Sequence, residues 1–126
     1  MEGTEFLDKA VKVVNSNIDD ESFGVSELAA ELGLSRSQTL RKVKALTGTS
    51  ANHFIRDIRL EQATELLMED TFTISEIAYI VGFSSPSYFN KCFHDAYGIT
   101  PGDYKKHDDA EIIINPSKKQ NVFIKE

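Results

Sequence analysis

The sequence predicts an all-α fold in which two helix-turn-helix subdomains are joined by one long linker helix, with about seven helices in total. Three observations support this prediction. The chain contains an internal repeat of about 50 residues, each copy has apolar residues at helical spacing, and the stretch between the copies contains neither glycine nor proline.

The repeat consists of two blocks. Val25–Ser35, with the sequence VSELAAELGLS, matches Ile74–Ser84, with the sequence ISEIAYIVGFS. After one inserted residue in the second copy, Ser37–Gly48 matches Ser87–Gly98. Apolar residues recur at positions i, i+3, i+4 and i+7, which form one stripe of an amphipathic helix. They are Val25, Leu28, Ala29 and Leu32 in the first copy and Ile74, Ile77, Ala78 and Val81 in the second.

Each copy is interpreted as a short helix, a tight turn and a second helix. Glycine adopts a left-handed conformation at a helix end at the least cost, and serine is a good N-cap for the helix that follows. A further glycine ends the second helix, which is expected at about 36–47 in the first copy and at 86–97 in the second. In chain order these signals are Gly33, Ser35 and Gly48, and then Gly82, Ser84 and Gly98.

The remaining elements follow from the same kinds of signal. The stretch at 50–69 is expected to be one linker helix, and an N-terminal helix over about Glu5–Asn17 covers the first unit. Thr100-Pro101 begins a short last helix that ends near His107. The predicted division is 1–49 for the N-terminal helix and first helix-turn-helix, 50–69 for the linker helix, 70–107 for the second helix-turn-helix and final helix, and 108–126 for a tail that is disordered or a small hairpin.

The charge of the chain is unevenly distributed. A net charge of −6 at pH 7 argues at first sight against nucleic acid. However, residues 1–34 carry −6 whereas residues 35–59 carry +5. A polyanion responds to the field of the face that it meets more than to the total charge. The basic block at 35–59 therefore permits nucleic acid as a partner, with weak non-specific binding at physiological salt.

Composition also limits the cellular setting. Cys92 is the only cysteine, so no internal disulfide can form and a reducing cytoplasm fits best. No apolar run approaches the roughly 20 residues of a membrane span, and the N-terminus lacks the apolar core of a secretory signal. The domain is expected in the cytoplasm without membrane contact, and a tether of a longer parent protein to the inner membrane is left open.

Both copies of the repeat resemble a known family. Glu76–Tyr104, with the sequence EIAYIVGFSSPSYFNKCFHDAYGITPGDY, is similar to the second-unit signature of the AraC/XylS-type DNA-binding domain, and the linker segment Arg56–Leu67 is similar as well. The resemblance covers about residues 5–107. The stretch LSRSQTLRKVKALTG followed by SANHFIR most resembles the C-terminal output domains of hybrid two-component regulators, in which a sensor, a kinase and a receiver precede this module.

This resemblance implies sequence-specific binding of double-stranded DNA and regulation of bacterial transcription, as an activator that contacts RNA polymerase. It implies no cofactor, no small-molecule ligand and no catalysis for this domain. The chain is expected to be the C-terminal fragment of a longer protein whose other segments pair two copies. A linker helix of about 19 residues spans roughly 28 Å, so DNA bending would accommodate the difference from the roughly 34 Å between successive major-groove segments.

The buried stripe of each recognition helix determines which side chains point outward. The inward positions are expected to be Thr39, Val43 and Leu46 in the first helix and Phe89, Phe93 and Ala96 in the second. At about 100° per residue, the opposite face carries another set, to which the resemblance assigns base contacts. This set is Ser37, Leu40, Arg41 and Lys44 in the first helix and Ser87, Asn90, Lys91 and His94 in the second.

Arg41 is the strongest single candidate, because a guanidinium can bind guanine O6 and N7 in a bidentate manner. Asn90 fits adenine, and Leu40 fits a thymine methyl group. Helix N-termini attract phosphate through their free N–H groups. The residues expected at phosphates for this reason are Ser35, Arg36, Ser84 and Ser85.

Other interpretations of these residues remain to be compared. The basic residues could form an ordinary solvated face, and for Ser37, Ser87 and His94 singly that alternative is about as good. Cys92 is interpreted as a small buried hydrophobe rather than a zinc ligand. Five aromatic residues at helical spacing are interpreted as core, namely Phe72, Phe83, Tyr88, Phe89 and Phe93. The competing function is a helical protein-interaction or dimerisation module without DNA binding, which the net charge of −6 motivates.

Overall fold

The computed structural model describes residues 2–106, and the residues of regular structure in this range are all helical. The predicted all-α class is confirmed. The expectation of disorder or a hairpin at 108–126 concerns residues outside the described range, as does the predicted end of the last helix near His107. The helices are α1 (Glu2–Ser16), α2 (Val25–Leu32), α3 (Arg36–Thr47), α4 (Ala51–Glu69), α5 (Ile74–Ile80), α6 (Pro86–Tyr97) and α7 (Pro101–Lys106).

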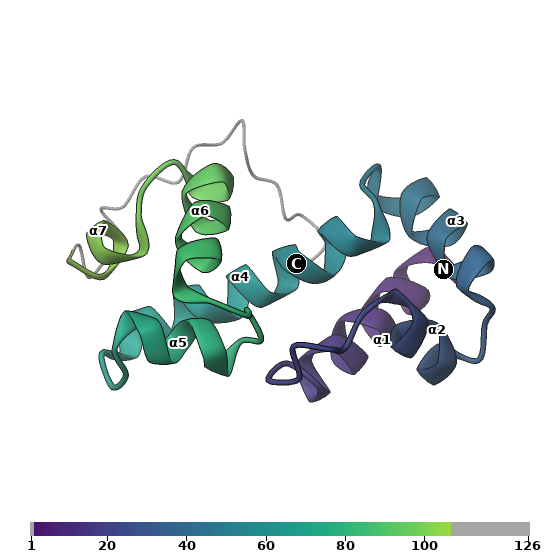
Figure 1. Cartoon of the computed structure of the whole chain (residues 1–126). Helices are drawn as coiled ribbons and strands as arrows, with labels where there is room; N and C mark the ends of the chain where they lie inside the picture. Colours follow the sequence, from purple (N-terminus) through teal and green to yellow (C-terminus); the bar gives the residue numbers. More distant parts are fainter. Residues whose placement is uncertain (1, 107–126) are drawn as a thin grey trace.

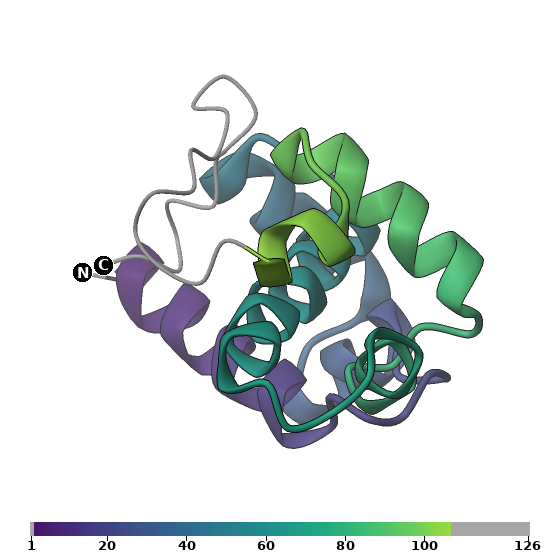
Figure 2. The same cartoon turned by 90° about the vertical axis from the view of Figure 1, so that its left-hand side faces the viewer.

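The helix α4 connects two units. Figure 1 shows α1, α2 and α3 (the first unit) at one end of α4 and α5, α6 and α7 (the second unit) at the other. In that view α3 lies above α1 and α2, and α6 lies above α5. Figure 2, turned by 90°, shows α3 and α6 again in the upper part of the molecule. The two predicted recognition helices therefore lie on the same side of α4.

The first helix begins earlier than the sequence predicts. It starts at Glu2 instead of Glu5 and ends at Ser16 instead of Asn17. The apolar stripe begins only at Phe6, so it does not mark the first turn. That turn lies close to α3 instead. A Cβ added at Gly3 would be only 3.0 Å from Leu46 Cδ2.

Each unit has its own hydrophobic core, and α4 contributes to both. Its N-terminal half supplies Phe54 and Ile58 to the first core, and its C-terminal half supplies Leu60 and Leu67 to the second. Ile18, which follows α1, packs against both cores. Full burial of such a side chain contributes about 1.5–3 kcal/mol, so the packing of both units holds α4 in place.

The inward face of the recognition helices is largely as predicted, with one error. Leu46 is 42% exposed, so its assignment to the buried stripe was wrong. It lies at the end of α3 near Gly3 in the first turn of α1, and much of its side chain stays at the surface. Ala96 is partly buried against the second core. Cys92 is buried, as expected for a small hydrophobe. The confirmed inward positions, all fully buried, are Thr39, Val43, Phe89 and Phe93.

Aromatic rings form much of the second core. The ring centroids of Phe83 and Phe89 lie 5.2 Å apart, and those of Phe89 and Phe93 lie 5.7 Å apart. Tyr88 was also assigned to this core, but it is 46% exposed. One residue before Phe89, it is rotated by about 100° around the helix axis and lies at the edge of the surface.

The helix α6 begins at residue 86 as predicted, but its N-cap differs by one residue from the repeat-based prediction. Ser85, not Ser84, is the N-cap, and its Oγ accepts a hydrogen bond from the Tyr88 N–H at 3.2 Å. Pro86 explains the shift. Its ring forces the preceding residue into extended backbone, which an N-cap requires, and Ser85 has φ −154 and ψ 151.

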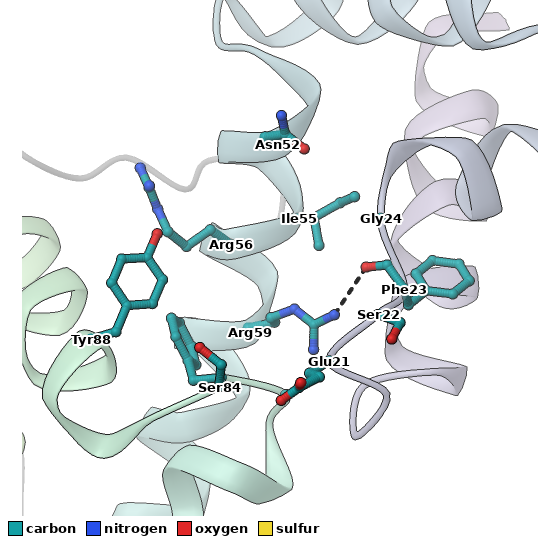
Figure 3. A pocket seen from close by; sticks show the side chains of 12 residues that line it. Glu21, Ser22, Phe23, Gly24, Asn52, Ile55, Arg56, Arg59, Ser84 and Tyr88 are labelled. Atoms are coloured by element: carbon teal, nitrogen blue, oxygen red, sulfur yellow. Dashed lines mark hydrogen bonds between the residues drawn. The ribbon is translucent and has the colours of Figure 1, made fainter.

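Arg59 of α4 connects the two units through four backbone carbonyls. Its Nη1 donates to Ile18 O at 2.5 Å and to Val81 O at 2.8 Å. Its Nη2 donates to Asp20 O and to Phe23 O, both at 3.1 Å, and Figure 3 draws the bond to Phe23. Three acceptors belong to the segment between α1 and α2, and one lies at the end of α5. The guanidinium thus fixes the second unit against the first.

The electrostatic setting of Arg59 is consistent with this structural role. The residue is only 6% exposed. Burial lowers the pKa of its guanidinium, and the carboxylates of Asp20, Asp19 and Glu21 act in the opposite direction. Arginine stays charged in proteins, so the carbonyl dipoles and this acidic segment together compensate a charge that has lost its water.

Glycine is required at position 82 by the same contact. Gly82 has φ +94, which is in the left-handed region that side chains disfavour. A Cβ at this position would overlap Arg59 Nη1 and Ile18 O. The close approach of backbone to guanidinium therefore leaves no room for a side chain.

We expect Gly82→Ala to lower the free energy of unfolding by more than about 3 kcal/mol, because backbone strain adds to the loss of the Arg59 contacts. Urea denaturation followed by circular dichroism measures this. Gly33→Ala is the matched control, since Gly33 has φ +74 but a Cβ there would meet nothing within 4 Å. It should cost only the backbone strain of about 1–2 kcal/mol. Equal losses in the two variants would contradict a steric role for Arg59.

Candidate nucleic-acid interface

The helix α3 is capped at both ends and carries a basic sequence. Ser35 Oγ accepts a hydrogen bond from the Gln38 N–H at 3.0 Å, and Gln38 Oε1 accepts one from the Ser35 N–H at 2.9 Å. This capping box fixes the start of the helix, and Gly48, with φ 81, ends it. The helix contains no acidic residue, and its basic residues are Arg36, Arg41, Lys42 and Lys44.

The residues of α3 that were predicted to contact bases lie at the surface. Ser37, Arg41 and Lys44 are exposed, whereas Leu40 is partly buried against the first core. Lys44 Nζ donates to Gly48 O at 3.3 Å, which directs it toward the end of the helix. Arg41 lies between the two ends of the exposed face, where a long cationic side chain has most freedom to meet a ligand.

The equivalent residues of α6 are exposed too. Ser87, Asn90, Lys91 and His94 all lie at the surface. Lys91 Nζ is 3.1 Å from Asp95 Oδ2, and the two side chains are 71% and 65% exposed. Such an exposed ion pair contributes little to stability, but it reduces the positive charge that this helix offers to an anion.

The residues predicted at phosphates surround the two helix starts. Ser35, Arg36 and Ser84 are exposed, and Ser85 is partly buried. The Oγ atoms of Ser35 and Ser85 serve as capping acceptors. A hydroxyl that accepts in this way still has its proton to donate. Both starts therefore combine a hydroxyl donor with the free N–H groups of a helix N-terminus, a combination suited to phosphate.

The two helices differ in charge. Four basic residues and no acid occupy α3, whereas α6 has Lys91, His94 and Asp95. A polyanion that contacted both helices would be attracted mainly by the first unit. Shape complementarity and hydrogen bonding would account for a larger share of the binding by the second unit.

A cleft of about 480 Å³, which the sequence did not predict, lies between the two units. Asn52 and Arg56 line it from α4, Ser84 and Tyr88 from the start of α6, and Glu21 from the segment between α1 and α2 (Figure 3). The one sequence feature that pointed to this cleft was the position of Arg56 within the basic block at 35–59. That Arg56 faces residues of the second unit depends on the tertiary structure.

Neither a metal site nor a membrane span is found in the described part of the chain. Within 2–106, no three His, Cys, Asp or Glu side chains are grouped so that they could hold a metal ion. None of the helices in this range combines the length and the apolar character that a membrane span needs.

Comparison with protein families identifies the fold. A family model described as a helix-turn-helix domain matches residues 28–107. The chain belongs to this family, in its AraC/XylS type. The family assignment inferred from the sequence is therefore confirmed, and the family is one of DNA-binding transcription regulators rather than enzymes.

One curated relative of this AraC/XylS-type domain is a much larger protein. It is named histidine kinase P4, from Formosa agariphila, and is 44% identical over 101 residues. These residues make up 80% of this chain but only 7% of that protein. The chain likewise spans only a minor part, between 23% and 36%, of other curated relatives that it matches.

Solved structures share most of this fold. An AraC-type transcriptional regulator from Chromobacterium violaceum has a TM-score of 0.75 at 29% identity, covering 81% of this chain and 90% of that one. The DNA-binding domain of AdpA, solved in complex with a target DNA, has a TM-score of 0.71 at 28% identity, covering 80% and 90%. The AraC/XylS-type arrangement of two units on one linker helix is thus compatible with bound DNA.

We expect Asp95→Asn to strengthen DNA binding, because it removes a negative charge beside the exposed face of α6 and releases Lys91. The logarithmic dependence of the affinity on salt should become steeper by about 1. Fluorescence anisotropy with a labelled duplex at several salt concentrations measures both. Asp103→Asn, an equal charge change in α7, is the control. The same gain in both variants would show only an effect of net charge.

Proposed function

We propose that this domain binds a specific double-stranded DNA sequence by inserting α3 and α6 into successive segments of the major groove, and thereby regulates bacterial transcription. The observation that carries this proposal is the pair of capped helices on the same side of α4, whose outward side chains are exposed (Figure 1). A helix in this position is the usual element for base recognition by a helix-turn-helix.

The length of α4 supports simultaneous contact of both helices. Its 19 residues span roughly 28 Å at about 1.5 Å per residue. Successive major-groove segments on one side of B-DNA are about 34 Å apart. A bend in the DNA accommodates this difference, at a cost that depends on the sequence of the duplex.

Individual residues have distinct roles in this proposal. Arg41 binds guanine, Asn90 binds adenine and Leu40 contacts a thymine methyl group, in keeping with the chemistry of each base edge. The other base-reading residues are Ser37, Lys44, Ser87, Lys91 and His94, and the phosphate-binding residues are Ser35, Arg36, Ser84 and Ser85.

The chain is proposed to act as the output domain of a longer hybrid two-component regulator. The identity of 44% to part of a histidine kinase supports this proposal. Segments outside this chain would then pair two copies on direct or inverted half-sites. The resulting complex would activate transcription in the cytoplasm through contact with RNA polymerase.

The competing proposal is a protein-interaction module that does not bind DNA, and the net charge of −6 favours it. The two proposals differ in what they require of the exposed faces of α3 and α6. DNA binding requires their basic and amide side chains, whereas an interaction module would be expected to place apolar side chains there.

The decisive experiment first selects bound sites from a random duplex pool, where two short conserved blocks about one helical turn apart are expected. We then expect Arg41→Ala combined with Lys91→Ala to weaken binding of the selected duplex at least 100-fold and to lower the salt slope by about 2. Lys9→Ala combined with Lys12→Ala, two exposed lysines of α1, is the control with the same charge change. Tight binding by the Arg41 and Lys91 variant, with an unaltered salt slope, would contradict the assignment.

A further inference from the structure

The cleft between the two units lies where bound DNA would pass. We infer that it receives the phosphodiester backbone of the DNA between the two major-groove segments, and that Arg56, assisted by Asn52 and Tyr88, binds that backbone. The inference rests on the proposed function and assigns contacts that are separate from the base-reading residues. It would give the domain a third point of attachment, in the N-terminal third of α4.

The position of the cleft supports this assignment. Asn52 and Arg56 are four residues apart and share one face of α4, in the N-terminal third of the helix. Ser84 and Tyr88 border the cleft from the start of α6. Tyr88 also flanks the exposed face that carries Lys91, since the two are three residues apart. Because Tyr88 adjoins the exposed face of α6, we place the backbone of a duplex held by α3 and α6 at the mouth of the cleft.

The side chains of the cleft are suited to phosphate. Arg56 offers a planar guanidinium that can bind a phosphate in a bidentate manner. Asn52, which is exposed, offers an amide donor, and the half-exposed Tyr88 offers a phenol donor. The other guanidinium of the cleft, that of Arg59, faces four carbonyls. The cation that can meet a ligand here is therefore Arg56, which Figure 3 draws on the same side of the cleft as Tyr88.

Glu21 provides a test of opposite sign within the same cleft. Glu21 is exposed, and it lines the side of the cleft that belongs to the first unit. A phosphate bound by Arg56 would be repelled by this carboxylate. Loss of the positive charge and loss of the negative charge should therefore change DNA affinity in opposite directions.

The experiment uses the duplex selected by the wild-type domain and measures its dissociation constant across a range of KCl concentrations. We expect Arg56→Gln to weaken binding about tenfold, to lower the salt slope by about 1 and to leave the selected sequence unchanged. Arg56→Lys should keep the slope and part of the affinity. Glu21→Gln should strengthen binding about two- to fivefold. Circular dichroism of each variant establishes that the helices are retained.

The matched controls are Lys106→Gln in α7 and Glu65→Gln in α4, both exposed and neither lining the cleft. Phosphate ethylation interference supplies the direct readout. With the wild type, ethylation of phosphates between the two conserved blocks should interfere with binding. This interference should disappear for Arg56→Gln and should remain for the control variants Lys106→Gln and Glu65→Gln.

The outcomes separate this inference from the proposed function. If the variant with Arg41→Ala and Lys91→Ala loses binding but Arg56→Gln binds DNA like the control variant Lys106→Gln, the cleft does not bind DNA. The proposed function still stands in that case. If the wild-type domain selects no sequence from the duplex pool, both fall together. Changed sequence preference in Arg56→Gln would also overturn the inference, because a phosphate contact carries no base information.

Discussion

The guanidinium of Arg59 determines how the two units are oriented, because its four carbonyl acceptors come from both of them. Each unit has its own core on the continuous helix α4, which sets their approximate relative rotation. The hydrogen bonds of Arg59, at defined angles, connect the units directly and fix this orientation further. Gly82 allows the backbone to come close enough for this contact. The common orientation of α3 and α6 thus depends on a polar contact far from their exposed faces.

The acidic character of the chain has a structural origin in part. Asp19, Asp20 and Glu21 oppose the effect of burial on the Arg59 guanidinium, and Glu21 also lines the cleft that contains Arg56. The same acidic segment thus stabilises the junction and reduces the attraction of the domain for any polyanion. An acidic chain with a local basic helix binds non-specific DNA weakly, which leaves more of its affinity to depend on base contacts.

Much of the fold could be predicted from the sequence because its signals are local. The repeat, the capping serine at position 35 and the left-handed glycines gave the bounds of α3 and α6 correctly. The exposure of Leu46 and Tyr88 was missed because it depends on which elements cover them. Arg59 was counted in the basic block although it is buried, since charge counts do not distinguish a surface cation from a structural one. The cleft could not be predicted, because it exists only once the two units are docked.

The continuity of α4 restricts how such a domain can change its target. Adding or deleting one residue in a helix rotates everything beyond it by about 100° and shifts it by about 1.5 Å. In α4, that change would turn α6 away from the side of the duplex that α3 faces, and would also carry Arg59 or its acceptors out of register. The separation of the two half-elements within a target is therefore inherited with the linker helix, whereas the bases within each half-element are free to diverge with the side chains of α3 and α6.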